Sequence, residues 1–246
     1  QRQMCIRDRY GELGELEIAN ELYQETLVIA MEQQGTNSNI VLQILDQYGG
    51  FFAELGEYEM ADVVYEKAYL VSTEALGAQN PRTTLRLQTL ANSDAELQRY
   101  ELAEQRLQDA QATLVTAVGA EALPTINVLE DLAQLYQRQG KLRPALEPLE
   151  QSYALRTKVQ GPEETQTLET KERLAELYRQ LGRLDEAEPM FLEVIATAEQ
   201  LLGIADPLVI DAKSHLAQLY ENTNNFVASL RYYQEVYEID QQIPVS

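Results

Sequence analysis

The sequence predicts an all-α fold, an open right-handed superhelical solenoid built from antiparallel helix pairs. Two observations predict this fold. Two glycine-rich series each repeat every 42 residues, and apolar residues recur at helical spacing between the glycines. The first series is Gly35, Gly77, Gly119, Gly161 and Gly203, and the second is Gly14, Gly56, Gln98, Gly140, Gly182 and Asn224. A fixed period of this length indicates a repeat architecture, in which each unit packs on its neighbours.

Each repeat contains a helix A that ends at the second series and a helix B that ends at the first. In the fifth repeat, Gly182 supplies the left-handed conformation that ends helix A. The small Ala187 lets the two helices approach, and Phe191 fills the space beside them. Pro207 opens the next helix A, where a missing N–H costs little. The period predicts helices near 38–55, 57–76, 81–97, 99–118, 124–139, 141–159, 164–181, 183–202, 207–222 and 226–241, with no strand.

The predicted repeat domain covers residues 10–246. Its repeats are a partial one at 10–34, then 35–76, 77–118, 119–160, 161–202 and 203–246. In the third repeat Gln98 replaces glycine and Asp94 replaces an aromatic residue, so looser packing of its two helices is expected.

Residues 1–9 depart from the repeat pattern. Arg7 and Arg9 fall at positions that the other repeats bury, where an unpaired charge is costly. The string resembles translated sequencing-adaptor sequence, and the alternative is a genuine terminal half-repeat. We interpret residues 1–9 as a non-native or frayed segment.

The repeat carries a recognisable signature. Leu174-Ala175-x-x-Tyr178 followed by Ala187-x-x-x-Phe191 resembles the tetratricopeptide repeat. The 42-residue period, with Gly-Arg-Leu-Asp-Glu-Ala-Glu-Pro at 182–189, is similar to the kinesin light chain type. The resemblance implies a protein–protein interaction scaffold that binds a polypeptide segment in a concave groove lined by the helices A.

Composition narrows the classes of partner and site. The chain has 40 acidic and 19 basic residues and a net charge of −21, which argues against nucleic acid and anionic lipid. It has no apolar run long enough to span a membrane. With one cysteine and one histidine, we expect no catalytic residues, metal site or cofactor. The scarcity of cysteine is compatible with both cytoplasm and periplasm. We favour the cytoplasm, and the periplasm stays an alternative because a non-native segment at residues 1–9 would hide the true N-terminus.

The candidate partner-binding groove follows from the register of the helices A. Its outward positions carry ten acids against three arginines, so we expect a cationic or polar protein or peptide. The candidate residues are Asp46, Asn92, Glu130, Asp131, Gln134, Glu172, Arg173, Glu176, Arg179, Asp211, His215 and Gln218. Some family members bind a C-terminal carboxylate with a clamp of lysine and asparagine side chains. In this chain only Asn92 has the residue type that such a clamp requires.

Two features within the groove allow a second interpretation. His215 could titrate near neutrality and tune binding, or it could be a solvated groove residue. Glu163 and Glu164, with Glu169 and Glu172 on one helix face, could form an acid/base or metal cluster, or simply a solvated face, which we favour. We expect a scaffold and not an enzyme. The alternative is a regulatory or sensor repeat module of a larger enzyme whose catalytic domain lies upstream.

Overall fold

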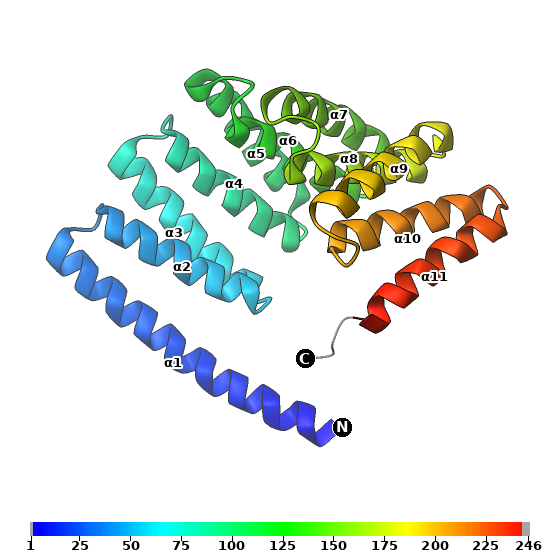
Figure 1. The fold of residues 1–246 in the computed structure, drawn as a ribbon. Helices are drawn as coiled ribbons and strands as arrows, with labels where there is room; N and C mark the ends of the chain where they lie inside the picture. Colours follow the sequence, from blue (N-terminus) through cyan, green and yellow to red (C-terminus); the bar gives the residue numbers. More distant parts are fainter. Residues whose placement is uncertain (1, 243–246) are drawn as a thin grey trace. The chain divides into compact units, whose positions relative to one another are not determined.

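The computed structural model describes the backbone of residues 2–242 and the side chains of residues 17–241. Within residues 2–242 the chain forms eleven α-helices and no strand (Figure 1). The helices are α1 (Arg2–Gln34), α2 (Asn39–Glu54), α3 (Tyr58–Leu76), α4 (Pro81–Glu96), α5 (Tyr100–Val118), α6 (Leu123–Arg138), α7 (Leu142–Val159), α8 (Thr165–Gln180), α9 (Leu184–Leu201), α10 (Pro207–Asn222) and α11 (Phe226–Gln242).

The ten helices predicted from the period are confirmed, and no boundary differs by more than one residue. The even-numbered helices α2 to α10 are the helices A, and α3 to α11 are the helices B. Gly182 ends α8 with a φ of +76°. At the same position of other repeats, Gln98 and Asn224 also adopt a left-handed φ of 59°. The turn is therefore kept even where a side chain makes it unfavourable. The chain is an all-α repeat solenoid.

The first helix contradicts one expectation. The period places a turn at Gly14, but α1 continues through this residue from Arg2 to Gln34. Glycine permits a left-handed turn but does not require one. The turn forms only where packing of the two helices on either side of it stabilises it. The segment before Gly14 has arginines at Arg7 and Arg9, where other repeats have apolar or small residues, so its sequence is less suited to such packing.

Residues 1–9, which we predict to be non-native or frayed, lie partly outside the described residues. The backbone of residues 2–9 lies within α1. Residue 1 and the side chains of residues 1–16 lie outside the described part of the chain. The interpretation of this segment stays a prediction.

The chain divides into two compact units, residues 1–119 and 120–246. In each unit every helix packs against the helices next to it in sequence. The core of the second unit includes the fully buried Ala145, Ala187 and Phe191, at the small and aromatic positions of the repeat. The core of the first unit includes Phe52 and Ala61.

The third repeat, in the first unit, is not loosely packed, so that expectation was wrong. Asp94 is fully buried and forms an ion pair with Arg106 and a longer one, 3.5 Å, with Arg99. Arg99 also binds Asp62 at 2.6 Å. Burial raises the pKa of Asp94, against the opposing attraction of Arg106. Ion pairs thus fill the space that an aromatic ring fills in other repeats, and the neighbouring Leu107 stays fully buried.

Candidate functional site

Every candidate groove residue lies on a helix A. Asp46 on α2 and Asn92 on α4 belong to the first unit. The other ten belong to the second unit, on three helices: Glu130, Asp131 and Gln134 on α6, Glu172, Arg173, Glu176 and Arg179 on α8, and Asp211, His215 and Gln218 on α10. Each unit therefore carries its own part of the predicted surface.

Glu130 of the second unit is the centre of a hydrogen-bond network. Its Oε1 accepts from Ser152 Oγ at 2.6 Å, Arg156 Nε at 2.5 Å and Thr170 Oγ1 at 2.9 Å. Arg173 lies 3.7 Å from the other carboxylate oxygen. Burial opposes ionisation of Glu130, but the hydrogen bonds from Arg156 and Ser152 outweigh it and lower the pKa of this carboxyl.

Arg156 links three helices through the same network. It comes from α7, and its side chain is only 5% exposed. Its remaining guanidinium nitrogens donate to side-chain oxygens of Gln160 at 2.9 Å, Gln166 at 3.0 Å and Asn127 at 2.7 Å. Glu130 and Arg156 are thus a structural pair that holds α6, α7 and α8 in register.

A second pair joins two helices A. His215 Nδ1 on α10 lies 2.6 Å from Glu172 Oε1 on α8. The hydrogen bond with Glu172 raises the pKa of His215, against the opposite effect of burial. The contact with Glu172 gives His215 a partner on α8, and both interpretations of His215 stay predictions.

Glu176 and Arg179 form the third pair, within α8. Arg179 donates to both oxygens of Glu176, at 2.6 and 2.7 Å, and Gln180 donates to the same carboxylate. Burial opposes ionisation of Glu176, but the hydrogen bond from Arg179 outweighs it and lowers the pKa of Glu176. Three of the groove acids are therefore paired with bases, and the free negative charge of the surface is smaller than the residue count implies.

Unpaired acids lie at the beginning of α8 and α10, around a pocket of about 440 Å³. Glu169 and Asp211 line it, are exposed, and form no ion pair with another described residue. Asp206 accepts from Leu208 N at 2.9 Å and so caps α10. The other lining residues are Thr165, Glu172, Arg173 and Pro207. Two free carboxylates beside an apolar leucine can hold an ammonium or guanidinium group together with its alkyl chain.

The remaining candidates of the second unit are peripheral to this pocket. Gln134 on α6 is exposed, while Asp131 on α6 and Gln218 on α10 are half-buried. None of the three lines the pocket between α8 and α10. Sequence reasoning counted Glu169 among the ten acids of the groove face but did not single it out, because the period does not show which acid another helix neutralises.

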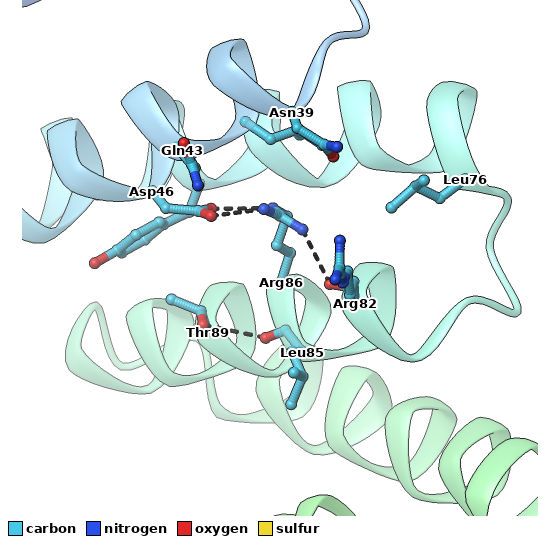
Figure 2. Close-up of a pocket in the computed structure, with 10 residues that line it drawn as sticks. Asn39, Gln43, Asp46, Leu76, Arg82, Leu85, Arg86 and Thr89 are labelled. Atoms are coloured by element: carbon cyan, nitrogen blue, oxygen red, sulfur yellow. Dashed lines mark hydrogen bonds and ion pairs between the residues drawn. The ribbon is translucent and has the colours of Figure 1, made fainter.

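The first unit has a pocket of about 530 Å³ between α2, α3 and α4 (Figure 2). Arg86 crosses it and binds Asp46 through two hydrogen bonds, 3.0 Å and 2.6 Å long. A third nitrogen of Arg86 donates to the carbonyl of Arg82 at 3.2 Å. Asp46 is therefore paired, like Glu130, Glu172 and Glu176 of the second unit. Asn92 is an exposed residue of α4 and does not line this pocket.

Arg86 is a site residue that sequence reasoning missed. It occupies the repeat position of Thr170, which faces the preceding helix A in the second unit. The only available signal was an arginine 40 residues after Asp46, close to one period.

No group of three or more His, Cys, Asp or Glu side chains among the described residues is placed to hold a metal ion. Within the same part of the chain, no helix combines the length and the apolar character needed to cross a membrane.

Comparison with known proteins gives the family and the fold. A family model described as tetratricopeptide repeat matches residues 83–158 and 166–242, more than half of the chain. No curated protein sequence matches it.

Among solved structures, BtubC (BKLC) from P. vanneervenii has a TM-score of 0.77 at 17% identity, covering 92% of this chain and 89% of that one. The nearly identical TPR-like repeats of a kinesin light chain type from Podosopora anserina give 0.72 at 20% identity, covering 83% and 97%. YrrB, described as a TPR protein with an unusual peptide-binding site, gives 0.52 at 17% identity, covering 88% and 93%. At these identities the likeness concerns the fold alone.

Proposed function

Because the chain belongs to the tetratricopeptide repeat family, we propose that it is a protein–protein interaction scaffold that binds a polypeptide segment along its helices A. Repeat solenoids commonly use such stacked helices as extended binding surfaces. A fold neighbour, YrrB, is described as having a peptide-binding site. That description concerns YrrB and supports the class of ligand proposed here.

The observation that carries the proposal is the pair of unpaired carboxylates around the pocket between α8 and α10. Glu130 and Glu176 are each neutralised by an arginine, and Glu172 pairs with His215, so these acids position helices more than they attract a ligand. Glu169 and Asp211 are exposed beside Leu208 and have no such partner among the described residues. A lysine or arginine of an extended partner segment fits this combination of charge and apolar surface.

Arg173 gives the pocket a second recognition element. It lines the same pocket, and its side chain is about one third exposed, so it remains accessible to a ligand oxygen. An arginine beside two carboxylates can donate a hydrogen bond to a backbone carbonyl oxygen of the ligand, while the acids hold its cationic side chain. This arrangement would fix the direction in which the segment lies.

Fluorescence anisotropy with a labelled extended peptide tests the proposal. The probe contains lysine, serine and proline, and its counterpart has glutamate in place of each lysine. We expect the lysine peptide to bind the parent. Its affinity for Glu169→Gln/Asp211→Asn should be about fivefold lower, because the variant loses two exposed charge pairs with the peptide. Binding should weaken as salt is added.

The matched control is Glu147→Gln/Asp185→Asn, which removes the same charge from exposed residues of the helices B α7 and α9. It should bind like the parent. Equal loss in both double variants would mean that bulk charge drives the interaction, and equal binding of the glutamate peptide would contradict recognition of a cation.

A further inference from the structure

The outward face of α3, in the first unit, carries large apolar residues in solvent. The exposed residues of this helix are Glu59, Met60, Val63, Glu66, Lys67, Leu70 and Glu74. Met60, Val63 and Leu70 are 44%, 65% and 54% exposed. Their spacing of three and seven residues places them on one side of the helix. We call these three residues the α3 strip.

The repeat provides an internal control for the α3 strip. The equivalent residues are Pro144, Glu147 and Ala154 on α7, and Glu186, Pro189 and Ala196 on α9. These helices B fold with polar, small or proline residues at the same positions. The repeat architecture therefore does not require Met60, Val63 and Leu70 to be apolar, and clustered exposed apolar residues without a folding role mark an interaction surface.

The preceding helix B extends the same pattern. On α1, Ile18 and Val28 occupy the positions of Met60 and Leu70, and both are more than half exposed. Both α1 and α3 pack against α2. The equivalent residues of α5 are Leu102, Gln105 and Ala112, and only Leu102 among these three is a large apolar residue. At the three positions of the α3 strip, large apolar residues are thus most numerous on α3, with two on α1 and one on α5.

The charges beside the α3 strip are mostly negative. Glu59, Glu66 and Glu74 share the exposed face of α3, and Lys67 is the one base among the exposed residues of this helix. None of these acids forms an ion pair with another described residue. A second copy of the chain would bring carboxylates against carboxylates, and like charges across an interface are costly. An anionic lipid surface would meet the same repulsion.

We propose that the α3 strip docks an amphipathic helix of another protein, with lysine or arginine beside its apolar side chains. Apolar anchors three, four and seven residues apart on such a helix match Met60, Val63 and Leu70. Its cationic side chains pair with Glu59, Glu66 and Glu74. This surface lies on a helix B and goes beyond the proposed binding along the helices A.

The test uses a synthetic helical peptide with leucines along one face and lysines beside them, labelled for fluorescence anisotropy. The strip variant is Val63→Gln/Leu70→Gln, and the matched control is Ala154→Gln/Ala196→Gln at equivalent positions of α7 and α9. We expect the strip variant to bind at least about tenfold more weakly than the parent, since two apolar anchors are lost. The control should bind like the parent, and circular dichroism should show the same melting temperature for all three.

Further arms separate the alternatives. Glu169→Gln/Asp211→Asn should keep its affinity for the helical peptide, so that loss at the strip and loss at the helix A pocket are distinguishable. A peptide with glutamate in place of lysine should bind the parent at least about tenfold more weakly.

Equal affinity of the strip variant and the parent, no binding by the parent, or equal binding of the glutamate peptide would each overturn the proposal. Binding of phosphatidylcholine vesicles that is lost in the strip variant, without peptide binding, would assign the strip to a lipid surface and overturn it as well.

Discussion

Replacing Arg156 with methionine removes the base that neutralises Glu130 inside the second unit. The two side chains are 5% and 14% exposed, so the carboxylate left behind stays largely out of water. Breaking a buried pair by removing one partner costs about 3–5 kcal/mol. Arg173 at 3.7 Å and two hydroxyl donors remain near Glu130, so we expect a loss of about 3 kcal/mol, at the lower end of that range.

Urea denaturation followed by far-ultraviolet circular dichroism measures this loss, because the chain has no tryptophan to report by fluorescence. The matched control is Lys158→Met on the same helix. Lys158 pairs with Glu121, but these side chains are 64% and 55% exposed. An exposed pair contributes at most about 1 kcal/mol, so the control should remain close to the parent.

The loss should also depend on pH with a defined sign. The pKa of Glu130 lies below its ordinary value of 4.5 in the folded chain. The stability that the ionised Glu130 contributes is therefore present when the pH is above its ordinary pKa, and it is lost as the pH falls through its lowered pKa in the folded chain. The difference between parent and Arg156→Met should shrink on acidification. A loss no larger than that of Lys158→Met, or one independent of pH, would refute the structural role of the pair.

Three other changes have expected outcomes. The hydrogen bond with Glu172 raises the pKa of His215. The pair should therefore add about 1–2 kcal/mol to the free energy of unfolding below about pH 6.5, and this stabilisation should be lost as pH rises through the raised pKa of His215. Urea midpoints of parent and His215→Gln should converge above that value, and parallel pH profiles would contradict this. Ala187→Leu should overpack the fully buried contact and cost about 1–3 kcal/mol, whereas Ser229→Leu should cost less because α11, the last described helix, packs mainly on α10. Equal thermal melts of the two variants and the parent would refute the small-residue argument. Gln98→Gly should raise the free energy of unfolding by about 1 kcal/mol, since its φ of 59° strains a residue with a Cβ, and a lower melting temperature would contradict this.

The helices could be predicted from sequence because their ends depend on local chemistry. Gly182 adopts a positive φ at the end of α8, and Pro207 occupies the start of α10, as the period requires. The same reasoning failed at Gly14, because a turn there depends on packing partners and not on glycine alone. It also failed to anticipate that Asp94 would be buried with arginines in place of an aromatic ring.

The charge state of the groove could not be predicted in the same way. The candidate residues all lie on the helices A, as the register predicts. Which acid is neutralised depends on side chains from other helices, such as Arg156, 26 residues after Glu130, or His215, 43 residues after Glu172. The period fixes which positions face outward. The pairing of charges depends on the particular residue at each repeat.

The most direct test of the proposed binding along the helices A is photo-crosslinking of the extended lysine peptide, with a photoreactive group at its centre. Mass spectrometry should find adducts within α8 (Thr165–Gln180) and α10 (Pro207–Asn222), and their yield should fall in Glu169→Gln/Asp211→Asn but not in Glu147→Gln/Asp185→Asn. Adducts concentrated on the helices B α7 or α9, or a yield unchanged when Glu169 and Asp211 are neutralised, would contradict the proposed site.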